Sequence, residues 1–133
     1  MTPRRLALFL ALALAGCPES GGGRETLRVL GRDVVLEGTR PLRGLELDLA
    51  WDAGLAVDAV TLGADAERMN LFRVDLRADG RSARVVLTDL RKLRLPVRGS
   101  LLHIEASGDG EVRIVRAVAA GDAAEAVPIE VLP

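Results

Sequence analysis

A strict alternation of apolar and polar residues is the feature that most constrains this fold. In residues 45–52, leucines and Trp51 occupy every second position, with acidic residues or alanine between them. Residues 72–77 repeat the pattern, with Phe72 and aliphatic residues alternating with arginine and aspartate. Because side chains of a β-strand point alternately to its two faces, each segment predicts a strand with one buried and one solvated face.

Further short segments of this kind follow at the spacing of a two-sheet sandwich. They are 27–30, 34–37, 56–62, 83–88, 101–106, 111–118 and 127–131. Pro128 removes a hydrogen-bond donor from the last segment, so we expect that strand at a sheet edge or with a bulge. Residues 62–71 have the composition for one helical turn. The sequence therefore predicts an all-β fold, a two-sheet antiparallel β-sandwich, with jelly-roll and immunoglobulin-like strand orders both open.

The N-terminus has the organisation of an export signal. Two arginines precede the apolar run 6–14, which is too short to span a bilayer permanently. Residues 14–17, Leu-Ala-Gly-Cys, resemble the lipobox of bacterial lipoproteins. The resemblance implies a signal peptide over residues 1–16 and a lipid-modified Cys17 as the mature N-terminus.

The residues after the lipobox predict the placement of the remaining chain. Cys17 is the sole cysteine, so an intramolecular disulfide is excluded. Pro18 stands where an aspartate typically retains such lipoproteins in the inner membrane, so we expect the outer membrane of the cell envelope. Residues 17–23 are rich in glycine and predict a flexible tether. Residues 24–133 then form one β-sandwich domain.

Residues 44–55 also resemble a segment of cohesin modules. In these modules an alternating strand ends in an aromatic residue and aspartate, and a second strand follows, here residues 57–60. The similarity continues at 100–104 and 111–114, whereas Ala53 departs from the proline that is common in cohesins. The resemblance implies a jelly-roll sandwich.

Residues with catalytic or metal-binding chemistry are sparse. His103 is the sole histidine, which excludes a multi-histidine metal site and leaves any serine triad dependent on this one residue. It alternates with Leu102 and Ile104, so we expect it to face solvent. Asp109 and Glu111 flank a glycine in a turn pattern that does not match an EF-hand loop. The sequence therefore predicts no enzyme activity, no cofactor and no metal.

Four arginines form a candidate partner-binding face. The near-balanced net charge of -1 gives no long-range attraction to nucleic acid, so we expect no nucleic-acid partner. Arg73, Arg77, Arg81 and Arg84 lie on two neighbouring predicted strands around the turn at residues 79–80. Guanidinium groups recognise carboxylate or phosphate bidentately. Interleaved aspartates leave open that these arginines are paired within the chain.

The aromatic residues discriminate between two binding functions. The mature chain has only Trp51 and Phe72, and both lie on apolar faces of predicted strands. We therefore predict a non-catalytic protein-interaction or scaffold module of the cell envelope, anchored to the membrane through Cys17, with an envelope protein as partner. The alternative is a carbohydrate or envelope-polymer binding module, which would require an exposed Trp51 as a stacking surface.

Overall fold

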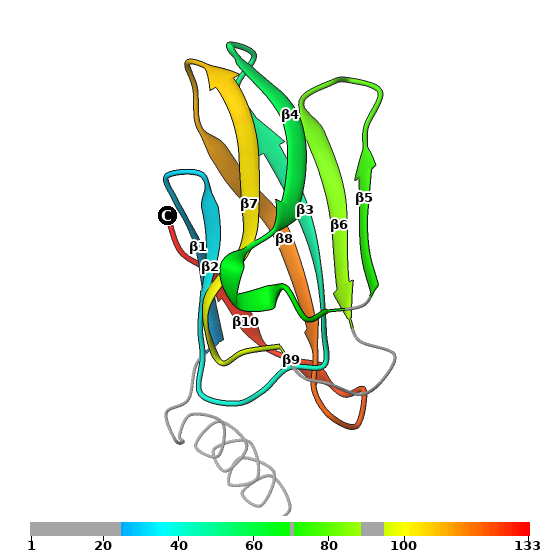
Figure 1. Cartoon of the computed structure of the whole chain (residues 1–133). Coiled ribbons are helices and arrows are strands. Elements are labelled where there is room, and N and C mark those ends of the chain that lie inside the picture. Colours follow the sequence, from blue (N-terminus) through cyan, green and yellow to red (C-terminus); the bar gives the residue numbers. More distant parts are fainter. Residues whose placement is uncertain (1–24, 70, 89–94) are drawn as a thin grey trace, which may run out of the picture.

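Two sheets pack face to face around one apolar core (Figure 1). The computed structural model describes residues 25–69, 71–88 and 95–133. The predicted signal peptide 1–16 and the tether 17–23, with Cys17, lie outside the described residues. Within the described ranges, no helix has the length and apolar character needed to cross a membrane.

The described chain is nearly all β, which confirms the predicted fold class. Its elements are β1 (Glu25–Leu30), β2 (Asp33–Glu37), β3 (Gly44–Trp51), β4 (Leu55–Leu62), η1 (Ala64–Ala66), β5 (Leu71–Leu76), β6 (Ser82–Thr88), β7 (Arg98–Gly108), β8 (Val112–Ala120), β9 (Ala126–Val127) and β10 (Ile129–Val131). The first sheet has the order β10-β1-β2-β7-β4, and the second has the order β5-β6-β3-β8-β9.

The core consists of alternate residues of the strands, as the sequence predicts. In β3 the three leucines and Trp51 are buried, and the residues between them face outward. The indole N–H of Trp51 donates to the carbonyl of Gly80 at 3.1 Å, so its polar atom keeps a partner in the core. Phe72 is half-buried and packs against the same core. Both aromatic residues therefore serve packing.

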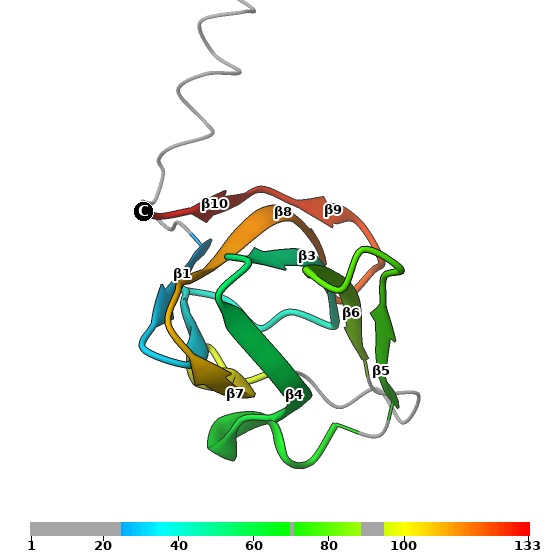
Figure 2. The same ribbon diagram turned by 90° about the horizontal axis from the view of Figure 1, so that it is seen from above.

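The C-terminal segment differs from the single strand predicted over 127–131. Pro128 divides it into β9, antiparallel to β8, and β10, parallel to β1 in the other sheet. Proline lacks the N–H that a continuous ladder would require, and the chain changes sheets at this residue. Both pieces are edge strands, so the predicted edge position is confirmed (Figure 2). Because β1 and β10 run parallel, the sandwich is not purely antiparallel.

A single turn of 3-10 helix, η1, follows β4 and lies within the range where the sequence predicts a helical turn. The N–H of Gly63 donates to the carbonyl of Leu101 at 2.8 Å. The carboxylate of Asp65 accepts from the N–H of Ser100 at 2.8 Å. These two contacts hold the turn against β7.

Glu25, the first residue of β1, is buried and charged, with 2% of its surface exposed. Its Oε1 accepts from the N–H groups of Thr39 and Arg40 at 2.8 and 3.2 Å. The guanidinium of Arg40 lies 3.7 Å from Oε2. One carboxylate thus satisfies two main-chain donors of the loop after β2 and ties that loop to the first strand.

Replacing Glu25 with alanine should lower the free energy of unfolding by about 2–4 kcal/mol. The main-chain N–H groups of Thr39 and Arg40 would then be left without a hydrogen-bond acceptor in a buried environment. Glu25→Gln keeps one acceptor oxygen and should cost less. Urea denaturation of both variants beside the unmodified protein measures the difference. Equal stability of all three proteins would contradict this role of Glu25.

Candidate interaction surface

The solvent-facing side of β5, β6, β3 and β8, here called the outer face, carries a row of alternating charges. Asp75, Arg84, Asp48 and Arg116 are register partners along this row, one from each strand. Directly opposite residues of antiparallel strands lie on the same face within contact distance, and opposite charges there are favourable. Each strand therefore presents a charge to a neighbour of opposite sign.

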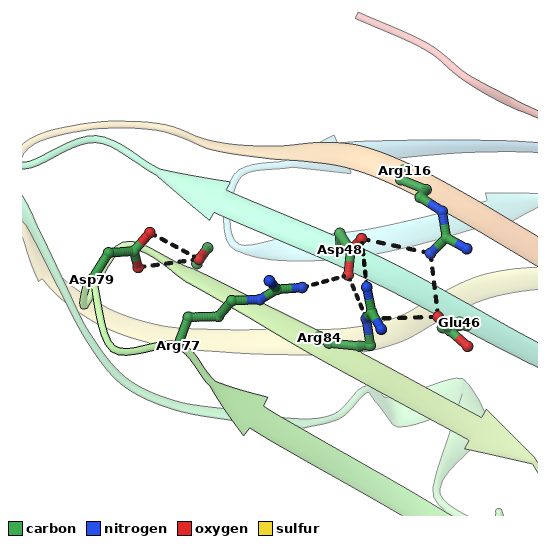
Figure 3. A network of polar contacts seen from close by, with 7 residues as sticks. Glu46, Asp48, Arg77, Asp79, Arg84 and Arg116 are labelled. Carbon is green, nitrogen blue, oxygen red and sulfur yellow. Dashed lines mark hydrogen bonds and ion pairs between the residues drawn. The ribbon is translucent and has the colours of Figure 1, made fainter.

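Three guanidinium groups converge on Asp48 (Figure 3). Arg84 Nε donates to Asp48 Oδ1 at 2.9 Å, and Arg77 Nη2 donates to the same oxygen at 3.4 Å. Arg116 Nη1 lies 3.5 Å from Oδ2. The carboxylate of Glu46 lies 3.2 Å from Arg116 and 3.6 Å from Arg84. We call these five residues the Asp48 cluster.

The cluster holds its arginines in fixed positions. The side chain of Asp48 is only 16% exposed. Its hydrogen bond with Arg84 lowers the pKa of Asp48 against the opposing effect of burial, and the charges of Arg84, Arg77 and Arg116 lower it further. The same hydrogen bond raises the pKa of Arg84. Three cations face two anions, so the cluster is net cationic, and each guanidinium has more donors than these contacts use.

The structure brings together two of the four arginines that the sequence singled out. Arg77 and Arg84 belong to the Asp48 cluster. Arg73, on β5, instead pairs with Asp75 on the same strand at 3.3 Å. Arg81 lies outside the cluster, in the loop between β5 and β6. Pairing within the chain, which the sequence left open, is therefore present at Arg73, Arg77 and Arg84.

Arg116 is the arginine of the Asp48 cluster that sequence reasoning missed. Strict alternation from the buried Ile114 would place residue 116 on the core side of β8. The register between β3 and β8 shifts between Asp48 and Leu49, so that Ile114 pairs with Leu49 while Arg116 pairs with Asp48. Val115 is the extra residue of this β-bulge, and the bulge returns Arg116 to the outer face.

Exposed aliphatic side chains flank the Asp48 cluster. Val118 on β8 is 44% exposed, and Leu71 on β5 is 39% exposed. Val118 is the register partner of Glu46 and Leu71 that of Thr88, which places both on the outer face. Arginine is enriched in protein interfaces and in their energetically important parts, and exposed aliphatic side chains add apolar surface that a partner can cover. The outer face is therefore a candidate protein-binding surface.

His103 and Trp51, the other residues that the sequence pointed to as possible ligand-binding groups, lie outside the outer face. His103 is exposed, as predicted, and its Nδ1 lies 2.9 Å from Asp33 Oδ1 on the neighbouring strand. Among the residues that the structure describes, no three His, Cys, Asp or Glu side chains gather in a metal-binding arrangement. Trp51 is only 3% exposed and provides no stacking surface for a sugar.

Asp48→Asn should destabilise the protein by about 1–2 kcal/mol at neutral pH, because charge-assisted bonds to arginine are lost. The pKa of Asp48 is lower in the folded protein, so its contribution is complete above the unfolded value of about 3.9. That contribution disappears as the pH falls through the folded pKa. Denaturation of both proteins from pH 7 down to acid should show their difference shrinking below about pH 4; a difference independent of pH would exclude this origin.

Comparison with known proteins identifies the architecture. No protein-family model matches the sequence, and no curated protein matches it. Solved cohesin modules, however, have the same fold. A non-cellulosomal cohesin from the archaeon Archaeoglobus fulgidus is 15% identical with a TM-score of 0.65, and the match covers 82% of this chain and 85% of that one.

Two further cohesins were solved in complex with dockerins. The sixth cohesin of scaffoldin B from Acetivibrio cellulolyticus is 15% identical with a TM-score of 0.69 over 84% of this chain and 94% of that one. The cohesin of a type I cohesin–dockerin complex from Clostridium thermocellum is 9% identical with a TM-score of 0.68 over 83% and 88%. At these identities the likeness establishes the fold alone: the described residues, 25–69, 71–88 and 95–133, form a jelly-roll β-sandwich of the kind found in cohesin modules.

Proposed function

We propose that this chain is a non-catalytic protein-interaction module of the cell envelope, held at the membrane by a lipid on Cys17, and that its outer face docks a protein partner. The Asp48 cluster, flanked by exposed Val118 and Leu71, is the observation that carries the proposal. The likeness to cohesins solved together with dockerins supports a protein as the partner.

The arginines of the Asp48 cluster are held in place before a partner binds, which lowers the free-energy cost of binding. Ordering a long side chain at an interface costs about 0.5–1.5 kcal/mol of free energy. Asp48 and Glu46 already hold Arg77, Arg84 and Arg116 in place in the free protein. A partner carboxylate can therefore bind the unused guanidinium donors without ordering those side chains first. The net positive charge of the cluster favours an acidic patch on the partner.

The buried aromatic residues favour a protein ligand over a carbohydrate. Sugar-binding modules present aromatic rings on their surface, whereas Trp51 lies in the core and Phe72 packs against it. The outer face offers guanidinium and aliphatic groups instead. These groups match the side chains of another protein better than the flat face of a sugar ring.

A photo-reactive phenylalanine analogue at Leu71 should form one discrete protein adduct in intact cells, because this position borders the docking surface. The adduct should disappear in the Val118→Asp variant, which alters the far side of the outer face, and in the double variant Arg77→Glu with Arg84→Glu. Immunoblotting of crosslinked membranes measures the adduct, and thermal melts establish that each variant is folded.

The matched control places the same analogue at Glu105, which is exposed on the solvent side of the other sheet. We expect no adduct from that position. An adduct of equal intensity from Glu105, or an adduct from Leu71 that survives in folded Val118→Asp, would contradict docking through the outer face.

The membrane anchor makes a separate prediction. Protein purified from membranes should begin at Cys17 and carry the added mass of a diacylglycerol and an amide-linked acyl chain, because several chains are needed for durable anchoring. Cys17→Ala should remain uncleaved and lose that mass. Intact-mass spectrometry of both proteins measures this, with separation of inner and outer membranes giving the location. An unacylated soluble protein would contradict the anchor and leave the outer face to be tested by crosslinking.

A further inference from the structure

β5 is the outermost strand of the second sheet, and one of its margins is open (Figure 1). Among the described strands it pairs with β6 alone. The N–H of Arg77 donates to the carbonyl of Ser82 on the β6 side at 2.9 Å. Because main-chain groups alternate in direction along an antiparallel ladder, residues 72, 74 and 76 direct theirs away from β6, toward the open margin.

The core side of β5 leaves apolar surface at this margin. Phe72 and Val74 are only half-buried where they pack against the core. Leu76, the register partner of the buried Ala83, is 58% exposed. An edge strand with free main-chain groups is a template for another strand, and natural proteins usually protect such an edge. The margin of β5 therefore has the properties of a strand-pairing site.

The outward side of β5 carries two opposite charges, two residues apart. Arg73 and Asp75 are exposed, and Arg73 Nε lies 3.3 Å from Asp75 Oδ1 within the same strand. Charged side chains on an edge strand commonly prevent the pairing of two copies by repulsion. Here the signs differ, so a second β5 laid antiparallel along the margin can bring opposite charges together.

One register satisfies both the main-chain groups and the charges. With Val74 opposite Val74 of the second copy, Arg73 faces Asp75 of that copy, and Asp75 faces its Arg73. The main-chain groups of residues 72, 74 and 76 then bond to those of residues 76, 74 and 72. The charged residues fall between the bonded pairs, where opposing side chains lie closest. A two-fold axis at Val74 makes these contacts identical for both copies.

The limits of β5 favour this register over its neighbours. Pairing centred two residues earlier places Arg73 opposite Leu71 and removes the contacts between opposite charges. Pairing centred two residues later requires an extended chain beyond residue 76. The N–H of Gly80 donates to the carbonyl of Arg77 at 3.0 Å and closes a turn there. The register centred on Val74 is therefore the one that uses the whole strand.

We propose that this chain associates with a second copy of itself through the open margin of β5, as an antiparallel two-fold pair centred on Val74. Arg73 and Asp75 exchange their contact within one strand for two contacts between the copies. Because opposite residues of paired strands lie on the same face, the two outer faces lie on the same side of one joined sheet. The pair thus presents two Asp48 clusters, which gives avidity toward a partner with two acidic sites.

Cysteine substitution tests the register in membranes that contain the full chain. One tagged copy carries Arg73→Cys, and a second copy with a different tag carries Asp75→Cys. Opposite positions between bonded pairs lie about 4.5 Å apart at Cα, which a disulfide can bridge. Identical positions of the two copies are diagonal neighbours, about 7–8 Å apart. After mild oxidation, the mixed variants should therefore give about tenfold more disulfide dimer with both tags than two copies of either variant.

A charge exchange tests the contacts between the copies. Val74→Cys in both tagged copies reports the pairing as a disulfide, because Val74 lies opposite itself. Adding Arg73→Asp to both copies, or Asp75→Arg to both, sets like charges opposite each other and should lower the dimer about tenfold. Arg73→Asp in one copy with Asp75→Arg in the other restores opposite charges at both contacts and should regain that loss. Thermal melts establish that each variant is folded.

The matched control is Glu105→Cys, exposed on the other sheet, which should give no more dimer than the unmodified chain. The unmodified chain also measures any dimer formed through Cys17, which every copy contains. Equal dimer from mixed and identical cysteine variants, a charge exchange that restores nothing, or equal dimer from Glu105→Cys would each overturn the proposal. Neither measurement involves the partner of the outer face, so the two proposals fail separately. In crosslinking from Leu71, an adduct with the mass of two chains belongs to this pairing and is counted apart.

Discussion

Burial of the β3 side chains between the two sheets is the constraint on which the rest of the molecule depends. β3 is the middle strand of the second sheet, with β6 on one side and β8 on the other. Its leucines and Trp51 enter the core at every second position. Since a shift of one residue would turn this whole set toward solvent, the apolar burial fixes the register of β3 and, through it, of both neighbours.

The same register determines the chemistry of the outer face. Once Leu47 and Leu49 are committed to the core, Asp48 must point outward, between Arg84 of β6 and Arg116 of β8. The Asp48 cluster is therefore a consequence of core packing and does not depend on flexible surface loops, apart from the contribution of Arg77. A binding surface built this way inherits the rigidity of the sandwich beneath it.

The alternation of apolar and polar residues was sufficient to predict most strands and the burial of Trp51, because alternation is a property of consecutive residues. This pattern could not predict features that depend on the pairing of two segments far apart in the sequence. The position of Arg116 depends on a bulge that appears only when β8 pairs with β3. The division of the last strand depends on Pro128 meeting two different sheets. Arg77 and Arg84 were recognisable from the sequence as part of a charged face. That both contact the carboxylate of Asp48 could be known only from the pairing of the strands.

The change of sheet at Pro128 has a consequence for how the sandwich opens. The residues just before this proline pair with a strand of one sheet and those just after it with a strand of the other. The C-terminal segment therefore connects the two sheets along one margin of the sandwich. Separation of the sheets must first detach β9 from β8 or β10 from β1. A fluctuation that begins in one sheet is thereby passed to the other, and the two layers should open together as one cooperative unit.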